Sequence, residues 1–543
     1  MSFCHLGLVF LVLIWTNFGL AAKSGNATGM VDDANKQWCR VCHFEEKYTA
    51  VTKSVHGDLN CRDCHQSYHF NPHEAVQKPS DDIKVFESHG AKDPVALKAC
   101  TECHSDIAEE GVIPHGASQG KKSGAPFCLN CHGDPHVIQA STKLVPFEAR
   151  LKSNHFCANC HGDAAKMKEA GLNTQAVSTY EHSTHGRKLH LGSDKVPGCA
   201  TCHGGHAQAT LHSPQTHEMC KGCHSGATEA FVKLAAHRPL TPEGQTIGYY
   251  TVHFFAALTF LVILFLGLHV LFDFAATVRV LIFQKRTGAV SARHAREEEI
   301  TVQRFDIHQR IQHGLMGLSF IFLVLTGWPL SSHSVESSKY LVALFGGIDG
   351  CGTIHRVAAL GLVISAIYHL LYLIIHFRRG SLRFSMLPSL KDVTDLFHNL
   401  LFFVGLEKNR ARFPRYSYFE KFDYWAVFWG MAIMVSSGFV RWFPDTVARF
   451  LPSWFYDICH YAHADEALLA ALAIFMWHFY NVHLRLDVFP MSKVFLHGRL
   501  TLKQLEEEHG AEYEELSAQG KLSELQQAGK KGNQKEENKV KDE

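Results

Sequence analysis

Residues 199–224 read CATCHGGHAQATLHSPQTHEMCKGCH, a stretch with the pattern Cys-x-x-Cys-His at each end. Two thioether bonds from such a pattern attach a porphyrin, and the histidine that follows binds the porphyrin iron from one side. The pattern occurs seven times and uses fourteen of the 17 cysteines, so we expect seven covalently bound c-type haems. The seven copies are Cys39, Cys42 and His43; Cys61, Cys64 and His65; Cys100, Cys103 and His104; Cys128, Cys131 and His132; Cys157, Cys160 and His161; Cys199, Cys202 and His203; and Cys220, Cys223 and His224.

A disulfide or zinc framework is the alternative interpretation of so many cysteines. Exported cysteine-rich segments are often cross-linked by disulfides, and paired Cys-x-x-Cys motifs can bind zinc. Neither framework explains why a histidine follows the second cysteine in all seven copies. Haem attachment is therefore the favoured interpretation.

A second group of fourteen histidines in the same region could supply the distal iron ligands, of which seven are needed. His56, His89, His155 and His217 each precede a motif at short range and are the preferred candidates. Iron with two histidine ligands has no open position, which favours electron transfer over substrate binding. The pairing of the others stays open; they are His69, His73, His115, His136, His182, His185, His190, His206, His212 and His237.

The N-terminal residues 1–22 have the outline of a secretory signal peptide. An apolar run from Leu6 to Trp15 is followed by small residues, although the run has no Lys or Arg before it, so a retained membrane anchor is the alternative. Either case exports the region that follows. We expect residues 23–240 to form a periplasmic heptahaem cytochrome c domain of short helices and loops, with the haems as its core.

Five apolar segments within residues 245–490 are long enough to cross a membrane. The loops between the first and second and between the third and fourth hold fifteen Lys and Arg residues, whereas the other two hold only Lys339 and Arg449. This asymmetry predicts a multi-pass protein of the bacterial inner membrane whose charged tail, residues 491–543, is cytoplasmic and solvated. The segments are Tyr249–Phe283, Ile311–Leu330, Gly352–Phe377, Trp425–Phe443 and Ala467–Val488.

Five histidines lie in these predicted spans or, for His463, just before the outer end of the fifth, at positions suited to haem b. His355 and His369 of the third span, and His463 and His478 of the fifth, are spaced so that each pair returns to nearly one face of its helix. His313 in the second span adds another inner ligand. Two haems would use four of the five, and the alternative is hydrogen bonding between helices.

Residues 303–491 resemble the dihaem cytochrome b subunits of formate dehydrogenase and nickel-iron hydrogenase. The resemblance implies that His313 and His478 of this chain bind an inner haem, and that His355 and His463 bind an outer haem. His369 departs from this scheme and could replace His313, serve a quinone or only pack. The resemblance rests on Arg310-Ile-Gln-His313, Leu325-Thr-Gly327, His355-Arg356, Glu420-Lys421 with Tyr424-Trp425, and the segment from His463 to His478.

The expected fold is mostly α, a loop-rich multihaem cytochrome c domain fused to a five-helix transmembrane cytochrome b bundle. This architecture is similar to the inner-membrane c/b quinol dehydrogenases of metal-respiring and sulfate-reducing bacteria. The resemblance implies a quinol:cytochrome c-type oxidoreductase that takes electrons from menaquinol and passes them to periplasmic c-type cytochromes. Its partners would be the quinone pool and membrane lipid, and the net charge of +1 gives no reason to expect nucleic acid.

Two other functions remain open from the sequence. Electrons could flow in reverse, from a periplasmic donor to quinone, or the chain could be a terminal reductase of a small oxyanion with one open c haem. Polar and titratable residues at the cytoplasmic boundary are the candidates for a quinone site. These candidates are His308, Arg310, His369, Glu420 and Tyr424.

Overall fold

The computed structural model describes residue 50 and residues 53–59, 103–105, 146–203, 214–235, 237–286, 301–486 and 488–522. The chain divides into two compact units, residues 1–108 with 123–140 and residues 109–122 with 141–543. Each unit is described below by itself.

Four of the seven predicted haem c motifs fall wholly or partly outside the described residues. The first, second and fourth motifs lie outside them entirely, and the third is described only at Cys103 and His104. The haem attachment predicted for these motifs therefore stays a prediction from the sequence. The motif residues outside the described part are Cys39, Cys42, His43, Cys61, Cys64, His65, Cys100, Cys128, Cys131 and His132, and the distal candidates there are His69, His73, His89, His115, His136, His206 and His212.

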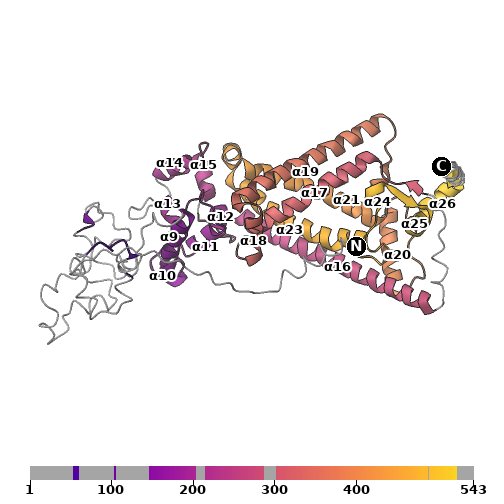
Figure 1. The fold of residues 1–543 in the computed structure, drawn as a ribbon, viewed down its shortest axis with the longest axis horizontal. Helices are drawn as coiled ribbons and strands as arrows, with labels where there is room; N and C mark the ends of the chain where they lie inside the picture. The colour runs from indigo at the N-terminus through magenta and orange to yellow at the C-terminus, as the bar shows by residue number, and fades with distance from the viewer. Residues whose placement is uncertain are drawn as a thin grey trace, which may run out of the picture. The chain divides into compact units, whose positions relative to one another are not determined.

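The last three motifs lie in a group of short helices, α9 to η3, which we call the motif helices (Figure 1). Their buried apolar side chains are few; Met167, Leu189 and Phe231 are among them. Three of these helices end in a cysteine motif. The helices α9 and α13 end at the histidine of their motif, and α14 ends at the second cysteine of its motif. The elements are α9 Pro146–His161, α10 Ala164–Glu169, α11 Ala176–Glu181, α12 Thr184–His190, α13 Cys199–His203, α14 Pro214–Cys223, α15 Glu229–Val232 and the 3-10 helix η3 Lys233–Ala235.

Four described helices are long and apolar enough to cross a membrane, and they make the chain an integral membrane protein. They are α16 Thr246–Arg286, α17 Ile307–Ser331, α19 Gly347–Arg378 and the continuous helical segment Ser453–Leu484. That segment consists of α23 Ser453–Ala473 and the π-helical turns η6 Ile474–His478 and η7 Tyr480–Leu484. This segment corresponds to the fifth predicted span. It begins at Ser453, well before the predicted start at Ala467.

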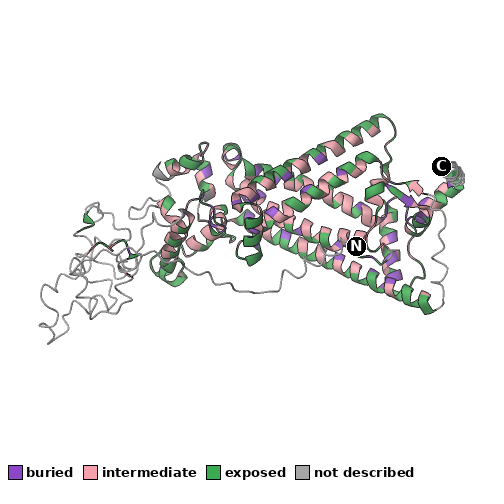
Figure 2. Ribbon diagram, in the orientation of Figure 1, coloured by how far each residue is buried: buried purple, intermediate pink, exposed green. Residues whose placement is uncertain are grey.

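The fourth predicted span, Trp425–Phe443, falls in α21 Tyr418–Trp442, which packs against α23. Charged residues near both ends of α21 lower its hydropathy, so the count of five spans stays a prediction. In the same bundle α17 packs on α19, and α16 packs on α23 (Figure 1). Large apolar side chains of the long helices, such as Phe260, Leu360 and Phe475, are exposed, as contact with lipid requires. Figure 2 shows that exposed positions recur along these helices.

Capping residues define where the bundle helices begin. Asp306 and Gln309 form a capping box at the start of α17, and Ser417 with Glu420 forms another at the start of α21. Gly346, with φ of 76°, provides the left-handed residue before α19. The connecting elements are α18 Glu336–Leu344, η5 Phe384–Met386, α20 Leu390–Val404 and α22 Pro444–Val447.

The segment after the last span packs against one end of the bundle, where we expected a solvated tail. The strand β2 Arg499–Thr501 pairs antiparallel with β1 Thr301–Gln303. His509 and Glu512 are buried, and Glu512 accepts from Arg304 at 2.8 Å and from Arg415 at 2.9 Å. Charged residues can be buried here because they meet opposite charges from distant loops. The helices are α24 Val494–His497, α25 Leu502–Glu508 and α26 Gly510–Ala518.

Candidate haem and quinone sites

Two pairs of histidines face each other inside the helix bundle. The ring centroids of His355 on α19 and His463 on α23 are 6.5 Å apart, and we call these two the outer pair, after the predicted orientation. Those of His313 on α17 and His478 in η6, the inner pair, are 6.1 Å apart. Two metal–nitrogen bonds of about 2 Å, with each centroid about 1 Å beyond its nitrogen, place bis-histidine centroids about 6 Å apart. Both pairs therefore have the spacing that one haem iron requires.

Hydroxyl groups orient the two rings of the outer pair. Thr326 Oγ1 lies 2.9 Å from Nδ1 of His355 and donates its own proton to the carbonyl of Phe322 at 2.6 Å. The hydroxyl must then accept a proton from Nδ1, which leaves Nε2 of His355 unprotonated. A neutral imidazole with a free Nε2 is the form that binds a metal, and the partner of its other nitrogen fixes that form.

The same arrangement is repeated on the other half of the bundle. Ser437 Oγ lies 3.0 Å from Nδ1 of His463 and donates to the carbonyl of Ile433 at 2.6 Å. A glycine follows each hydroxyl residue. A Cβ at Gly438 would lie 3.1 Å from Cε1 of His463, and one at Gly327 would lie 3.3 Å from Cε1 of His355. Ser437 and Gly438 were not among the sequence candidates, although the match to Thr326-Gly327 is a signal that points to them.

A carboxylate orients one ring of the inner pair. Asp423 Oδ2 on α21 lies 3.1 Å from Nδ1 of His478. His478 follows His463 by fifteen residues, one more than separates His355 from His369. The π-helical turn at Ile474–His478 accommodates this extra residue, so His478 keeps nearly the face of His463. The sequence did not single out Asp423.

His369 lies apart from these pairs, in a polar cluster between three helices. Its Nδ1 is 3.0 Å from Oε1 of Gln312 on α17, and its Nε2 is 3.0 Å from the hydroxyl of Tyr424 on α21. Both ring nitrogens therefore have hydrogen-bonding partners. Of the five histidines predicted for haem b, the structure brings four into two pairs and places His369 beside a quinone-site candidate, Tyr424.

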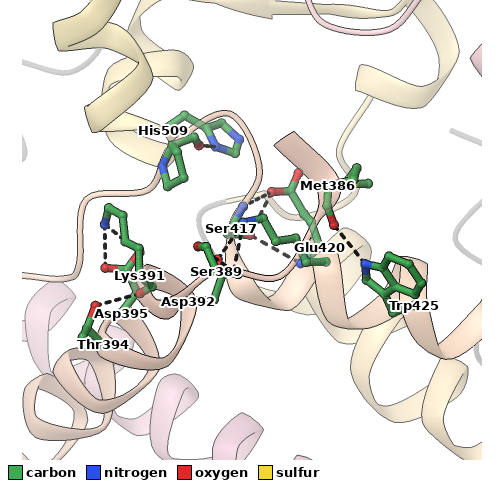
Figure 3. A network of polar contacts seen from close by, with 12 residues as sticks. Met386, Ser389, Lys391, Asp392, Thr394, Asp395, Ser417, Glu420, Trp425 and His509 are labelled. Carbon is green, nitrogen blue, oxygen red and sulfur yellow. Dashed lines mark hydrogen bonds and ion pairs between the residues drawn. The ribbon is translucent and has the colours of Figure 1, made fainter. Parts of the chain in front are cut away.

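The other quinone-site candidates contact different groups. Nδ1 of His308 lies 2.7 Å from the hydroxyl of Tyr368, and Arg310 donates to the carbonyl of Leu496. Glu420 lies one turn before Tyr424 on α21; it accepts from Ser417 and pairs with Arg304 at 3.4 Å. Figure 3 shows Glu420 and Ser417 in the polar network at this end of the bundle, with His509 nearby.

Three motif histidines of the described chain also have a second histidine at haem spacing. His203 of the sixth motif lies 6.0 Å from His237, and His224 of the seventh lies 6.4 Å from His185, between ring centroids. In the first unit, His104 of the third motif lies 6.5 Å from His56. His56 was a preferred distal candidate. His185 and His237 belonged to the open group, because only the fold brings them to their motifs.

The cysteines of the last three motifs form no disulfide bond in the described structure. Cys160 of the fifth motif and Cys223 of the seventh are exposed, whereas the others are partly buried. Exposed sulfur atoms at the ends of α9 and α14 are accessible to a porphyrin. The thiol of Cys157, at the start of the fifth motif, forms a hydrogen bond with Cys199 of the sixth. This contact joins two different motifs, so Cys157 and Cys199 are a candidate pair for the disulfide alternative.

The preferred distal candidates His155 and His217 have other surroundings. Nε2 of His217 lies 2.9 Å from the carbonyl of Ala227. His155 lines a cavity of about 490 Å³ together with His190, Tyr180 and Cys199. Open space beside a motif cysteine fits attachment of a porphyrin there.

His185, which faces His224 of the seventh motif, has the protonation state that iron binding would require. Burial, with smaller contributions from His224 and Lys188, lowers the pKa of His185 to about 4. The imidazole of His185 is therefore neutral at physiological pH. Only a neutral imidazole can donate a nitrogen lone pair to iron.

The comparisons with known proteins agree with the membrane half of this description. The family model of prokaryotic cytochrome b561 matches residues 224–389 and 304–485. A search of curated proteins found no match. The matched region contains both histidine pairs and the four membrane-spanning helices. Residues 224–485 are thus similar to the prokaryotic cytochromes b561, a family of membrane cytochromes b, and this similarity suggests membrane electron transfer with haem b.

Proposed function

We propose that the chain is a quinol:cytochrome c-type oxidoreductase of the bacterial inner membrane. It would transfer electrons from menaquinol to periplasmic c-type cytochromes, using two haems b and seven covalent haems c. The observation that carries this proposal is that two histidine pairs at haem spacing lie in the same bundle as a polar cluster suited to quinol. The family match supports membrane electron transfer with haem b.

The outer and inner pairs are the proposed haem b ligands. Haem bound there supplies one-electron transfer, and the protein supplies the ligands and their orientation. Thr326, Ser437 and Asp423 each hold one ring through Nδ1. This leaves Nε2 of each of these rings to bind iron, because the partner of Nδ1 determines which nitrogen is free.

The cluster of His369, Tyr424 and Gln312 is the proposed quinol site. Oxidation of a quinol releases two protons, so the site needs groups that accept a hydrogen bond from each hydroxyl and take up a proton. His369 can take up such a proton, the hydroxyl of Tyr424 can accept a hydrogen bond from a quinol hydroxyl, and Gln312 is adjacent in sequence to His313 of the inner pair. Glu420, one turn before Tyr424 on α21, pairs with Arg304 in the charged network that also contains His509.

Ligation of the c haems favours electron transfer over a terminal reductase. His104, His203 and His224 each have a second histidine at haem spacing, so these three irons would have no open position for an oxyanion. A high-spin haem signal in the purified protein would be evidence for the reductase.

An anaerobic assay of the detergent-purified protein tests the proposal. A reduced menaquinol analogue is added, and the absorbance bands of both haem types are followed in time. Reduction of b haem followed by c haem supports quinol oxidation. If quinol leaves the b haem oxidised while reduced c haem passes electrons to quinone, the flow is reversed. If b haem is missing, the bundle serves only as an anchor.

A further inference from the structure

A sixth pair of histidines lies where the motif helices meet the membrane bundle, within the second unit. His190 is the last residue of α12, and His333 lies in the turn between α17 and α18. Their ring centroids are 5.7 Å apart, with an interplanar angle of 38°. The five pairs described above are spaced by 6.0 to 6.5 Å. Neither His190 nor His333 belongs to a Cys-x-x-Cys-His motif.

Polar atoms around this pair lack partners. Nδ1 of His333 is buried without a hydrogen-bond partner in the described structure, and so is Nε of Arg187 on α12. Arg187 reaches across to the bundle, where its Nη1 donates to the carbonyl of Leu330 at 3.2 Å. Burial, together with the nearby Arg441 guanidinium, lowers the pKa of Arg187. A partly buried guanidinium without a carboxylate partner is costly unless another anion accompanies it.

Cations gather here in excess over carboxylates. Arg187 and Lys188 of α12 both interact electrostatically with Arg441 at the end of α21. Asp349 also acts on Lys188, but its ion pair, at 3.0 Å, is with Lys195. Among the described ion pairs, none joins Arg187, Lys188 or Arg441 to a carboxylate. The two propionate groups of a haem would provide the missing negative charges.

The wall beside the pair is apolar. Leu191, next to His190, packs with Val342, Ile348 and Cys351 of the bundle, and Leu330 and Phe345 cover this cluster. An apolar wall with cations at its edge is the environment that a porphyrin needs, since its ring is apolar and its propionates are charged. The motif helices and the bundle form this wall together.

A simple metal ion fits the pair less well. No group of three or more His, Cys, Asp or Glu residues in the described chain is arranged to hold a metal. Two imidazoles alone leave a zinc ion two ligands short. The four nitrogens of a porphyrin complete the coordination of an iron that has only two protein ligands.

We propose that His190 and His333 are the axial ligands of a third, non-covalently bound haem at the junction of the motif helices and the bundle. This inference goes beyond the proposed function, which assumes only two haems b. His190 lies five residues after His185 on the same helix, about 7.5 Å along its axis, and His333 lies seven residues after Thr326, the partner of His355. The site is thus between the ligand pair of the seventh c haem and the outer pair of the bundle.

The ratio of b to c haem, measured by pyridine haemochrome spectra of the purified full-length chain, tests the site. The expected ratio is three b per seven c in the wild type, and two per seven in His190→Ala and in His333→Ala. His253→Ala is the matched control, because His253 is an exposed histidine whose Nδ1 lies 2.8 Å from the carbonyl of Tyr249 on its own helix. The His253→Ala control is expected to keep three b haems per seven c haems.

A second variant separates loss of a ligand from loss of the fold. His333→Met is expected to keep three b haems, with one of them showing the near-infrared band of methionine-ligated ferric haem and a higher potential. A wild-type ratio of two per seven overturns the junction haem and leaves the proposed function intact, whereas a ratio of zero overturns both. Zinc or copper that is bound at one per chain and lost in His333→Ala, with haem unchanged, also overturns it.

Discussion

The hydroxyl of Ser437 lies 3.0 Å from Nδ1 of His463 on the neighbouring helix, just as the hydroxyl of Thr326 lies 2.9 Å from Nδ1 of His355. The two hydroxyls come from α21 and α17, and the two histidines from α23 and α19. The outer pair is therefore held by a structural repeat of two helix pairs. The residues that hydrogen-bond to the proposed ligand histidines determine the orientation and basicity of the imidazole rings.

Replacement of Ser437 by Ala is expected to weaken binding of the outer haem about 10- to 100-fold, since the Nδ1 proton of His463 loses its acceptor. The measurement is retention of b haem during dilution or competition with apomyoglobin. Ser436→Ala is the matched control, because Ser436 bonds to backbone carbonyls of its own helix. Equal haem loss in both variants would contradict the assignment.

Gly438→Val is expected to abolish the outer haem, because even a Cβ at this position lies 3.1 Å from Cε1 of His463 and a branched side chain must displace the ring. The b haem content should fall by one while the inner haem stays. Gly317→Val on α17, where a Cβ meets nothing within 4 Å, is the control. Unchanged b haem in Gly438→Val would show that the ring of His463 is free to move.

Asp423→Asn is expected to raise the midpoint potential of the inner haem. The carboxylate that accepts from Nδ1 of His478 makes this ligand more basic and stabilises the ferric state, so a neutral amide removes that preference. A potentiometric titration followed in the b-haem bands measures the shift. The potential of the outer haem should stay where it is; a shift of both haems by the same amount would point to a general structural effect.

His369→Gln and Tyr424→Phe are expected to slow quinol-driven haem reduction by at least about tenfold, because the first removes a base that can take up a quinol proton and the second removes a hydroxyl that can accept a hydrogen bond from quinol. The dithionite-reduced spectra and the b haem content should match the wild type, since neither residue is a proposed ligand. His376→Gln, in the last turn of α19 with Nδ1 bonded to Ser381, is the control. Loss of b haem in His369→Gln would instead make this residue a ligand.

Glu512→Gln is expected to destabilise the packed end of the bundle by about 3 kcal/mol, because the buried Arg304 loses its main counter-ion. Arg304 is 3% exposed and Glu512 is 10% exposed. Proteolysis after Arg or Lys in residues 499–522 should become faster. Glu514→Gln is the control, since its ion pair with Arg412 is mostly exposed and contributes little.

Several features follow from local sequence alone. Cys-x-x-Cys-His contains every atom that attaches and first ligates a c haem, so its seven copies can be recognised without a fold. Apolar length identifies membrane helices in the same way, and four of the five predicted spans coincide with helices that can cross a membrane. Both signals lie within one short segment.

The tertiary structure was needed wherever two distant segments make one site. His237 lies 34 residues after His203, and His333 is 143 residues from His190, so no spacing rule connects them. The buried tail residue Glu512 looked solvated because its partner Arg304 belongs to a remote loop. The sequence by itself predicted haem chemistry and determined that the chain enters a membrane. The fold decided which histidines face each other, because ligand pairing depends on how helices pack and not on the order of residues.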